Sequence, residues 1–315
     1  MKKATKTEYR LRNWSQYNAA LKRRGSLEVW LGSEVYDHWL ATEASGKRGA
    51  SAYYSDIAIE TISMLGSLYG LAGRQATGFV ESIFALLGLE LRVPDHSTVS
   101  RRLRRLEVSL TVSESTQARH VVVDSTGIKV FGEGEWKTRQ HGIGKRRTWR
   151  KLHLALDESS NEILASVVST NDFKDSQVLD DLLDQIDDPI DQVSADGAYD
   201  SWDCYASIER REARAAIPPR KDARIKSHGN CRGKKHARDE NLRQIRRQGR
   251  AQWKRDCGYH RRSLSETAMY RIKAIFGGRV RGRQFDVQAA ELLLQCLALN
   301  RMTRLGMPDS VAVRE

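Results

Sequence analysis

The sequence predicts an α/β protein, with a mixed five-stranded sheet flanked by helices and a mainly helical region before it. Residues 55–107 repeat apolar side chains at i, i+3 and i+4, which is the spacing of amphipathic helices. Residues 120–218 contain five short apolar or alternating segments with turn or helix signals between them. Three strands joined as hairpins, followed by strands separated by helices, give a mixed sheet covered by helices.

The composition indicates a polyanionic partner. The 315 residues include 53 Lys and Arg against 40 Asp and Glu, which gives a formal net charge of +13 and a pI near 9.7. Such a surplus favours nucleic acid, and double-stranded DNA is the partner we expect. A membrane surface is the alternative, but no apolar run approaches the roughly 18 residues of a membrane span.

The N-terminus and the cysteines predict a cytoplasmic protein. The first residues lack the apolar segment of a signal peptide. The four cysteines form no C-x-x-C pair, so we expect reduced thiols and neither zinc nor a disulfide framework.

The N-terminal part of the chain is predicted to be helical. Residues 1–50 are expected to form a basic arm and a helical segment, Leu27–Leu40, and residues 51–115 a DNA-binding region. Helices are expected in that region over Asp56–Leu71, Arg74–Leu87 and Thr98–Glu107. Gly88 can end the second of these, because glycine readily adopts the left-handed conformation.

The third of these helices is rich in arginine. Its basic residues are Arg101, Arg102, Arg104 and Arg105. Two helices followed by an arginine-rich one suggest a helix-turn-helix reader whose last helix lies in a major groove. The alternative is a three-helix packing unit with a solvated basic face. The net charge favours DNA binding, although the connection before the third helix is longer than a standard turn.

Residues 116–307 are predicted to form the sheet domain, with residues 308–315 as a tail. The expected strands are His120–Asp124, Trp149–Asp157, Glu162–Thr170, Gln192–Asp196 and Ala215–Pro218. The expected helices include Asp175–Ile186, Trp202–Arg214 and about Asp286–Arg304. Residues 220–262 hold sixteen Lys and Arg against four Asp and Glu, so we expect a solvated loop or a nucleic-acid surface there and no contribution to the core.

One further predicted helix places its polar residues on one face. Tyr259, Arg262, Glu266 and Lys273 fall within an arc of about 60° when each residue turns the helix by about 100°. The apolar residues Leu264, Ala268, Ile272 and Ile275 fall on the opposite side. An acid beside two cations is suited to metal-dependent chemistry on a phosphate backbone.

Two predicted strands end in an acid, Asp124 and Asp196. If these strands are parallel neighbours, their ends coincide, and a helix packed on the sheet can bring Glu266 to the same edge. Clustered carboxylates raise one another's pKa, and divalent ions remove that cost. Mg²⁺ prefers oxygen ligands, and two ions about 3.5–4 Å apart could activate the attacking oxygen and stabilise the leaving one. A single acid at a strand end is usually a loop or cap residue, so the hypothesis depends on the combination.

These residues lie in segments that resemble a known family. The pattern Y-x2-R-x3-E-x6-K is met by Tyr259, Arg262, Glu266 and Lys273. The segments VVVDSTGIKVFGEGEW and SADGAYDS resemble the blocks around the first and second catalytic aspartates of bacterial insertion-sequence transposases of the DDE type. The resemblance is closest to the insertion-sequence-five family and covers most of the chain after about residue 55. It extends to KRRTWRKLHLALD, IPPRKDA, GYHRRSLSET, GRQFDVQAAEL and PDHSTVSRRL.

The resemblance implies a function for each part of the chain. It implies an RNase H-like catalytic domain in which Asp124, Asp196 and Glu266 bind two Mg²⁺ ions, for which Mn²⁺ can substitute. It also implies that the N-terminal region recognises terminal inverted repeats, and that a homo-oligomer on DNA cleaves the element ends and transfers their 3′-hydroxyls to target DNA. Such an enzyme would act at the bacterial nucleoid. The alternatives are a non-catalytic DNA-binding regulator and a nuclease of the same fold, which cuts without joining.

Further residues are expected to contact DNA. Tyr259, Arg262 and Lys273 are predicted to bind phosphates beside the scissile bond, although Arg262 and Glu266 could form only a surface i, i+4 pair. The predicted DNA channel is lined by Lys145, Arg146 and Arg147, for which a solvated hairpin is the alternative. Trp253 could stack a flipped base or pack in the core.

Overall fold

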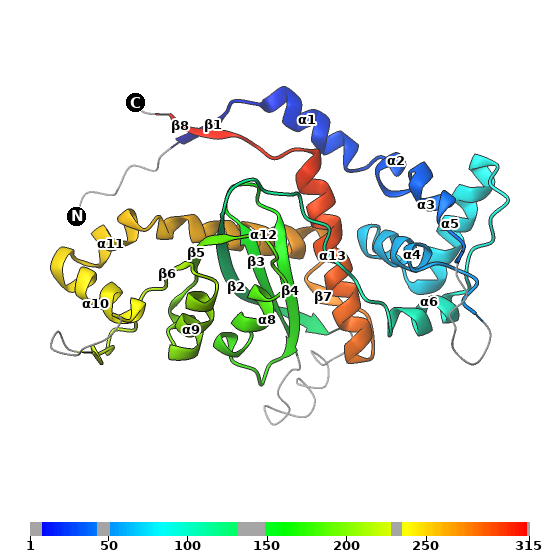
Figure 1. The fold of residues 1–315 in the computed structure, drawn as a ribbon. Coiled ribbons are helices and arrows are strands. Elements are labelled where there is room, and N and C mark those ends of the chain that lie inside the picture. Colours follow the sequence, from blue (N-terminus) through cyan, green and yellow to red (C-terminus); the bar gives the residue numbers. More distant parts are fainter. Residues whose placement is uncertain (1–7, 43–50, 131–148, 228–234, 314–315) are drawn as a thin grey trace, which may run out of the picture. The chain divides into compact units, whose positions relative to one another are not determined.

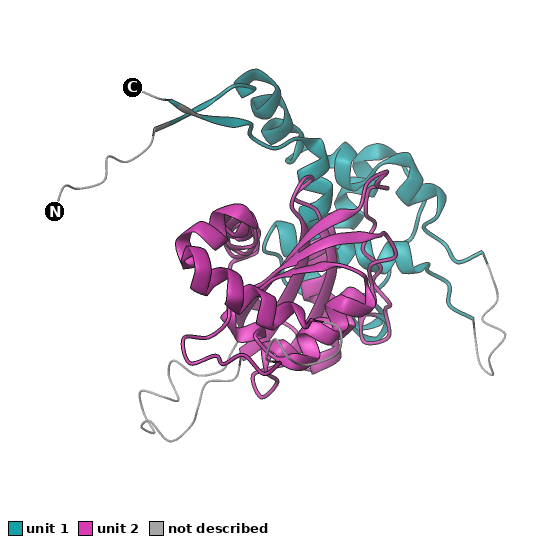
Figure 2. Ribbon diagram, turned by 60° about the vertical axis from the view of Figure 1, so that its left-hand side comes forward, with its two compact units in different colours: residues 1–102, 298–315 teal, residues 103–297 magenta. Residues whose placement is uncertain are grey.

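The computed structural model describes residues 8–42, 51–130, 149–227 and 235–313. The chain divides into two compact units, residues 1–102 with 298–315 and residues 103–297 (Figure 2). The long helix α13 (Phe285–Leu305) contributes residues to both units.

The second unit is built on one mixed sheet (Figure 1). Its strands are β2 (Arg119–Val130), β3 (Trp149–Asp157), β4 (Ile163–Thr170), β5 (Ile190–Ser194) and β6 (Arg214–Ala216), in the order β4-β3-β2-β5-β6. β3 is antiparallel to β2 and β4, whereas β5 is parallel to β2 and β6. The predicted mixed five-stranded sheet is therefore confirmed. A two-residue strand, β7 (Arg279–Val280), also pairs with the end of β2.

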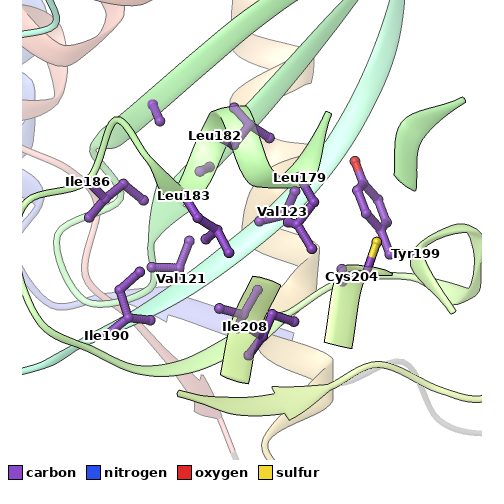
Figure 3. Close-up of a cluster of buried hydrophobic side chains, with 14 of the residues drawn as sticks. Val121, Val123, Leu179, Leu182, Leu183, Ile186, Ile190, Tyr199, Cys204 and Ile208 are labelled. Atoms are coloured by element: carbon purple, nitrogen blue, oxygen red, sulfur yellow. The ribbon is translucent and has the colours of Figure 1, made fainter. Parts of the chain in front are cut away.

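Helices cover both faces of this sheet. α8 (Leu179–Leu183) and α9 (Trp202–Arg210) lie on one face, where their side chains form a buried cluster with Val121 and Val123 of β2 (Figure 3). Because successive residues of a strand point to opposite faces, Val122 and Asp124 face the other side. That side is covered by α12 (Ser263–Phe276), which packs on β2 and β3.

The helix expected to begin at Tyr259 begins instead with a 3₁₀ turn, η3 (Tyr259–Arg262), which leads into α12. Gly258 precedes this turn with a φ of 63°, a conformation in which a side chain would be strained. Of the expected apolar stripe, Ala268 and Ile272 are buried.

Several expected elements have different bounds in the structure. The strand expected to end at Asp196 ends at Ser194, and the helix expected to end at Arg214 ends at Arg210. The strand predicted to end at Asp124 continues to Val130, because β3 pairs with it as far as Lys129 and β7 pairs with its last two residues. Asp124 therefore lies in the middle of β2. The helix expected over Asp175–Ile186 is a 3₁₀ turn, η1 (Asp175–Gln177), followed by the short α8.

The basic stretch 220–262 was expected to contribute nothing to the core, and this expectation is wrong for its described part. It forms α10 (Ala237–Gln248) and α11 (Arg250–Asp256), which bury Leu242 and Trp253. Asp239 is also buried and accepts hydrogen bonds from the backbone N–H groups of Lys226 and Ser227. Other residues of these helices, among them Arg246, Arg247 and Arg255, are exposed to solvent.

The first unit is mainly helical. It contains α1 (Trp14–Arg23), α2 (Leu27–Trp30), α3 (Ser33–Asp37), α4 (Asp56–Leu68), α5 (Gly73–Leu87) and α6 (His96–Leu103). Gly88 ends α5 in the left-handed conformation, as expected. The predicted helical segment Leu27–Leu40 is divided at Gly32, and residues 310–313 of the expected tail form β8 (Ser310–Val313), antiparallel to β1 (Glu8–Leu11). No helix in the described ranges is long and apolar enough to cross a membrane.

A buried ion pair anchors the start of β2. Arg119 is 3% exposed and pairs with Asp157 of β3 at 3.3 Å and with Asp188, before β5, at 2.6 Å. Asp157 is 4% exposed and also accepts hydrogen bonds from Ser159 and Ser160. Arg119 thus joins β2, β3 and the segment before β5 at the N-terminal end of β2, five residues before Asp124.

We predict that Arg119→Ala destabilises the protein by about 3–5 kcal/mol, because it leaves Asp157 buried without its cation. Chemical denaturation followed by circular dichroism measures the change. The matched control is Arg214→Ala, whose pair with Asp191 is exposed and should contribute less than about 1 kcal/mol. Equal destabilisation of the two variants would contradict this account.

Candidate active site

The parallel ladder between β2 and β5 places Asp124 and Asp196 at the same level of the sheet. Val122 pairs with Ser194 at the last rung, and each aspartate follows its rung by two residues. Asp124 remains within β2. Asp196 follows β5 and caps the single 3₁₀ turn η2 (Gly197–Tyr199), accepting a 2.9 Å hydrogen bond from the N–H of Ala198.

The Asp124 carboxylate lies between the sheet and α12. Its side chain is 14% exposed, and one oxygen accepts a 2.9 Å hydrogen bond from the N–H of Ser125. The other oxygen lies 2.5 Å from an Arg262 nitrogen and 3.1 Å from the Ser265 hydroxyl. Burial raises the pKa of Asp124, and the charge of Asp196 raises it further, although the three hydrogen-bond donors oppose this. A carboxylate in this position requires a nearby cation.

Arg262 forms ion pairs with two of the three acids. Its guanidinium binds Asp124 and, at 2.6 Å, Glu266. Burial alone would lower the pKa of Arg262, but Asp124, Tyr259 and Glu266 together raise it, so the guanidinium stays charged. Glu266 is one turn further along α12 and is 60% exposed, so it can turn toward a ligand at small cost.

Tyr259, the first residue of η3, lies near Arg262 and the two aspartates. Burial raises the pKa of its hydroxyl, and the charges of Asp196 and Asp124 act in the same direction, against Arg262. The phenol therefore stays neutral and can donate a hydrogen bond. Its ring lies 6.3 Å from that of Trp253, and the Lys254 ammonium lies 4.7 Å from the ring centre.

The structure thus brings Tyr259, Arg262, Asp124, Asp196 and Glu266 together where β5 ends beside the middle of β2. Lys273 is exposed and lies two turns beyond Glu266 on α12, where its side chain packs beside Gly278. Trp253 is 1% exposed, so in this conformation its ring packs in the interior and is not available to a base.

The remaining predicted DNA contacts include three arginines in and after α6. Arg101 of α6 and Arg105 are exposed. Arg102 pairs with Asp56 at 2.5 Å and donates to the carbonyl of Tyr54, so it also has a structural role in the first unit. Lys145, Arg146 and Arg147 lie outside the described residues.

Ser265 is a site residue to which the sequence pattern assigns no role. Its side chain is fully buried, with its hydroxyl near Asp124 and 2.7 Å from the carbonyl oxygen of Arg262. The sequence feature that could have predicted this role is a serine at the border of the apolar stripe of α12, one residue before Glu266. That signal is weak, because only the tertiary packing shows that this position faces Asp124.

Comparisons with known proteins identify the family. Residues 115–301, more than half of the chain, match a family model described as a transposase DDE domain. The chain belongs to the DDE transposase family. A second model with the same description matches residues 22–133. A solved structure, the piggyBac transposase synaptic complex with hairpin DNA, aligns with 94% of this chain and 76% of that chain, at 11% identity and a TM-score of 0.41.

The two family models confirm the predicted resemblance to DDE-type transposases. Transposases of this family act on DNA by cleavage and strand transfer, and they generally use divalent metal ions. The finer assignment to the insertion-sequence-five family stays a prediction.

The carboxylates of Asp124, Asp196 and Glu266 offer this transposase the type of oxygen ligand that a divalent cation prefers. Among the described residues, no three acidic, histidine or cysteine side chains are already arranged as a metal site. The oxygens of Asp124 and Glu266 are instead bridged by the Arg262 guanidinium. Hard oxygen donors, a buried carboxylate with a raised pKa and a second aspartate nearby are features that a divalent ion would stabilise.

We predict that Asp124→Asn makes the metal-free protein more stable at neutral pH. Asp124 has its pKa raised on folding, so its contribution is most favourable below its ordinary value of 3.8 and is lost as pH rises through the folded pKa. The substitution removes this penalty, and a gain of about 1 kcal/mol would raise the Tm by about 2–4 °C. Thermal unfolding in EDTA measures it.

The control for this prediction is Glu266→Gln, which changes an exposed acid and should leave the Tm nearly unchanged. The advantage of Asp124→Asn should also disappear in acid, where the wild-type carboxyl is protonated. A lower Tm for Asp124→Asn at neutral pH would mean that the ion pair with Arg262 outweighs the cost of burial.

Proposed function

We propose that this transposase binds the terminal inverted repeats of an insertion sequence, cleaves at the element ends and transfers the 3′-hydroxyl ends to target DNA. The observation that supports the proposal is the placement of Asp124, Asp196 and Glu266 relative to one another. Asp124 and Asp196 are aligned by the parallel ladder, and Glu266 is joined to Asp124 through Arg262. A protein that only bound DNA would gain nothing from these three acids.

In this proposal Asp124, Asp196 and Glu266 would hold two Mg²⁺ ions, for which Mn²⁺ can substitute. When bound, the ions would lower the pKa of the attacking hydroxyl and neutralise charge on the leaving oxygen. The protein's share is to hold Asp124 rigidly, through the N–H of Ser125 and the hydroxyl of Ser265. Glu266 is exposed and can adjust to the substrate.

Arg262 has a second role in the proposal. A guanidinium can bind a phosphate through two parallel hydrogen bonds, and Arg262 lies directly beside the acids. When DNA enters, the phosphate next to the scissile bond would replace Asp124 and Glu266 as its partner. Tyr259, a neutral hydroxyl beside Arg262, would donate to the same phosphate, and Lys273 would bind the backbone further along α12.

Residues 51–115 would provide recognition of the terminal repeats. Arg101 of α6 and Arg105 after it present exposed cations of the kind that contact DNA. The proposed organisation assigns residues 51–115 to a helix-turn-helix-like reader and residues 116–307 to catalysis. Two ends must be brought together for transfer, so the active form would be a homo-oligomer on DNA at the nucleoid.

We predict that Asp124→Asn, Asp196→Asn and Glu266→Gln each lower cleavage of end-containing DNA by several orders of magnitude, while binding to the ends remains. The assay uses labelled element ends, Mg²⁺ and a target plasmid. Joined donor–target product supports a transposase, and cutting without joining would identify a nuclease instead. Mg²⁺-dependent cleavage at the wild-type rate in any variant would overturn the acid assignment.

We predict that Arg262→Ala and Lys273→Ala each weaken binding to cleavage-site DNA by about tenfold, because each removes a charge-assisted hydrogen bond to phosphate. The slope of log K against log salt should fall by about 0.9 for each phosphate that the variant no longer neutralises. Fluorescence anisotropy over a salt series measures both quantities. The control Arg210→Ala, on the opposite face of the sheet, removes an exposed arginine and should leave affinity and slope unchanged.

A further inference from the structure

Asp200 is a buried carboxylate close to the second acid. Asp196 begins the one-turn helix η2 and Asp200 ends it, so only three residues separate them. The Asp200 side chain is fully buried and accepts three hydrogen bonds. Two come from Arg238 of α10, at 2.7 and 3.0 Å, and one from the N–H of Arg220, at 2.9 Å.

Arg238 is held in place by Trp202 as well as by its ion pair with Asp200. Its side chain is 11% exposed and lies 5.3 Å from the ring centre of Trp202, the first residue of α9. A guanidinium that binds a carboxylate with two nitrogens and packs beside an indole has little freedom. The pKa of Arg238 is raised mainly by its hydrogen bonds to Asp200, so the guanidinium stays charged.

The segment Ile217–Arg220 links η2 to the basic helices. A side-chain carbon added at Gly197, next to Asp196, would lie 3.5 Å from the carbonyl oxygen of Pro218. The carbonyl of Pro219 accepts a 2.8 Å hydrogen bond from Arg250 of α11, and the N–H of Arg220 donates to Asp200. The turn after Asp196 is therefore close to a segment that α11 binds directly and that α10 reaches through Asp200.

We propose that Asp200 and Arg238 are positioning residues for Asp196, and that they couple the basic helices α10 and α11 to the active site. This inference rests on the proposed function of Asp196. With Tyr199 in the core and Asp200 clamped by Arg238, the short turn fixes the backbone of Asp196. DNA phosphates that bind the exposed Arg246 and Arg247 of α10 would stabilise the helix that carries Arg238.

The cations of the stretch 220–262 then have two separate roles. Arg238 points inward and orders the active-site loop, whereas Arg246 and Arg247 are exposed at the C-terminal end of the same helix. Residues behind metal-binding side chains typically change metal affinity or activity by about 10–100-fold when substituted. A buried pair that served only stability would not change these quantities in the folded protein.

The experiment compares Asp200→Asn and Arg238→Lys with a stability control, in full-length protein bound to element-end DNA. Mn²⁺ affinity is measured by electron paramagnetic resonance, and kcat and KM for end cleavage are corrected for the folded fraction. We expect both variants to bind Mn²⁺ about 10–100-fold more weakly and to lose kcat to a similar extent, with KM for DNA nearly unchanged. Arg238→Lys keeps the charge and loses the two-nitrogen geometry, so it also serves if Asp200→Asn folds poorly.

The control is Arg119→Lys, which alters a guanidinium that is also buried and paired with carboxylates but lies at the other end of the sheet. It should lower the Tm and leave Mn²⁺ affinity and kcat at wild-type values. If Asp200→Asn and Arg238→Lys behave like this control, the positioning role is overturned. If wild-type protein neither cuts nor joins element ends, the proposed function fails instead, so the two failures are distinguishable.

Discussion

The ion pair between Asp124 and Arg262 is the interaction on which the site depends. Asp124 points from the middle of β2 into the contact between the sheet and α12, where burial raises the pKa of its carboxyl. Without a cation, an ionised carboxylate there would oppose the packing of α12 on the sheet. Arg262 lies at the junction of η3 and α12 and also pairs with Glu266, so one guanidinium joins an acid of the sheet to an acid of the helix.

Two buried networks, one at the start of β2 and one after β5, hold the backbone around Asp124 and Asp196. The buried Arg119 network ties β2 to β3 and to the start of β5, which stabilises that end of the sheet. The backbone hydrogen bonds between β2 and β5 set the register of the parallel ladder. That register brings Asp124 and Asp196 to the same level. At the other end, Asp196 leaves the sheet on a single 3₁₀ turn that ends at the buried Asp200. The two aspartates of this transposase are thus placed by rigid backbone, while Glu266 keeps the freedom of an exposed side chain.

The positive charge of the chain has two different roles in this structure. Arg119, Arg238 and Arg262 are largely buried and neutralise carboxylates that the fold brings inside. Other cations, among them Arg246, Arg247 and Lys273, are exposed and are suited to a phosphate backbone. A net charge alone cannot separate these groups, because composition does not record which cation faces a buried acid.

The sequence by itself determined the mixed sheet, the helices around it and the apolar face of α12, because periodicity reports which side of an element is buried. Its motif blocks also selected the three acids and Arg262. Only the tertiary structure decided that Asp124 lies within a strand, that Ser265 contacts it and that Trp253 is in the interior. It also showed that the basic stretch 220–262 is partly core, held by Asp200 and Asp239. These outcomes depend on partners distant in the chain, and local pattern carries no information about which distant residue a side chain will meet.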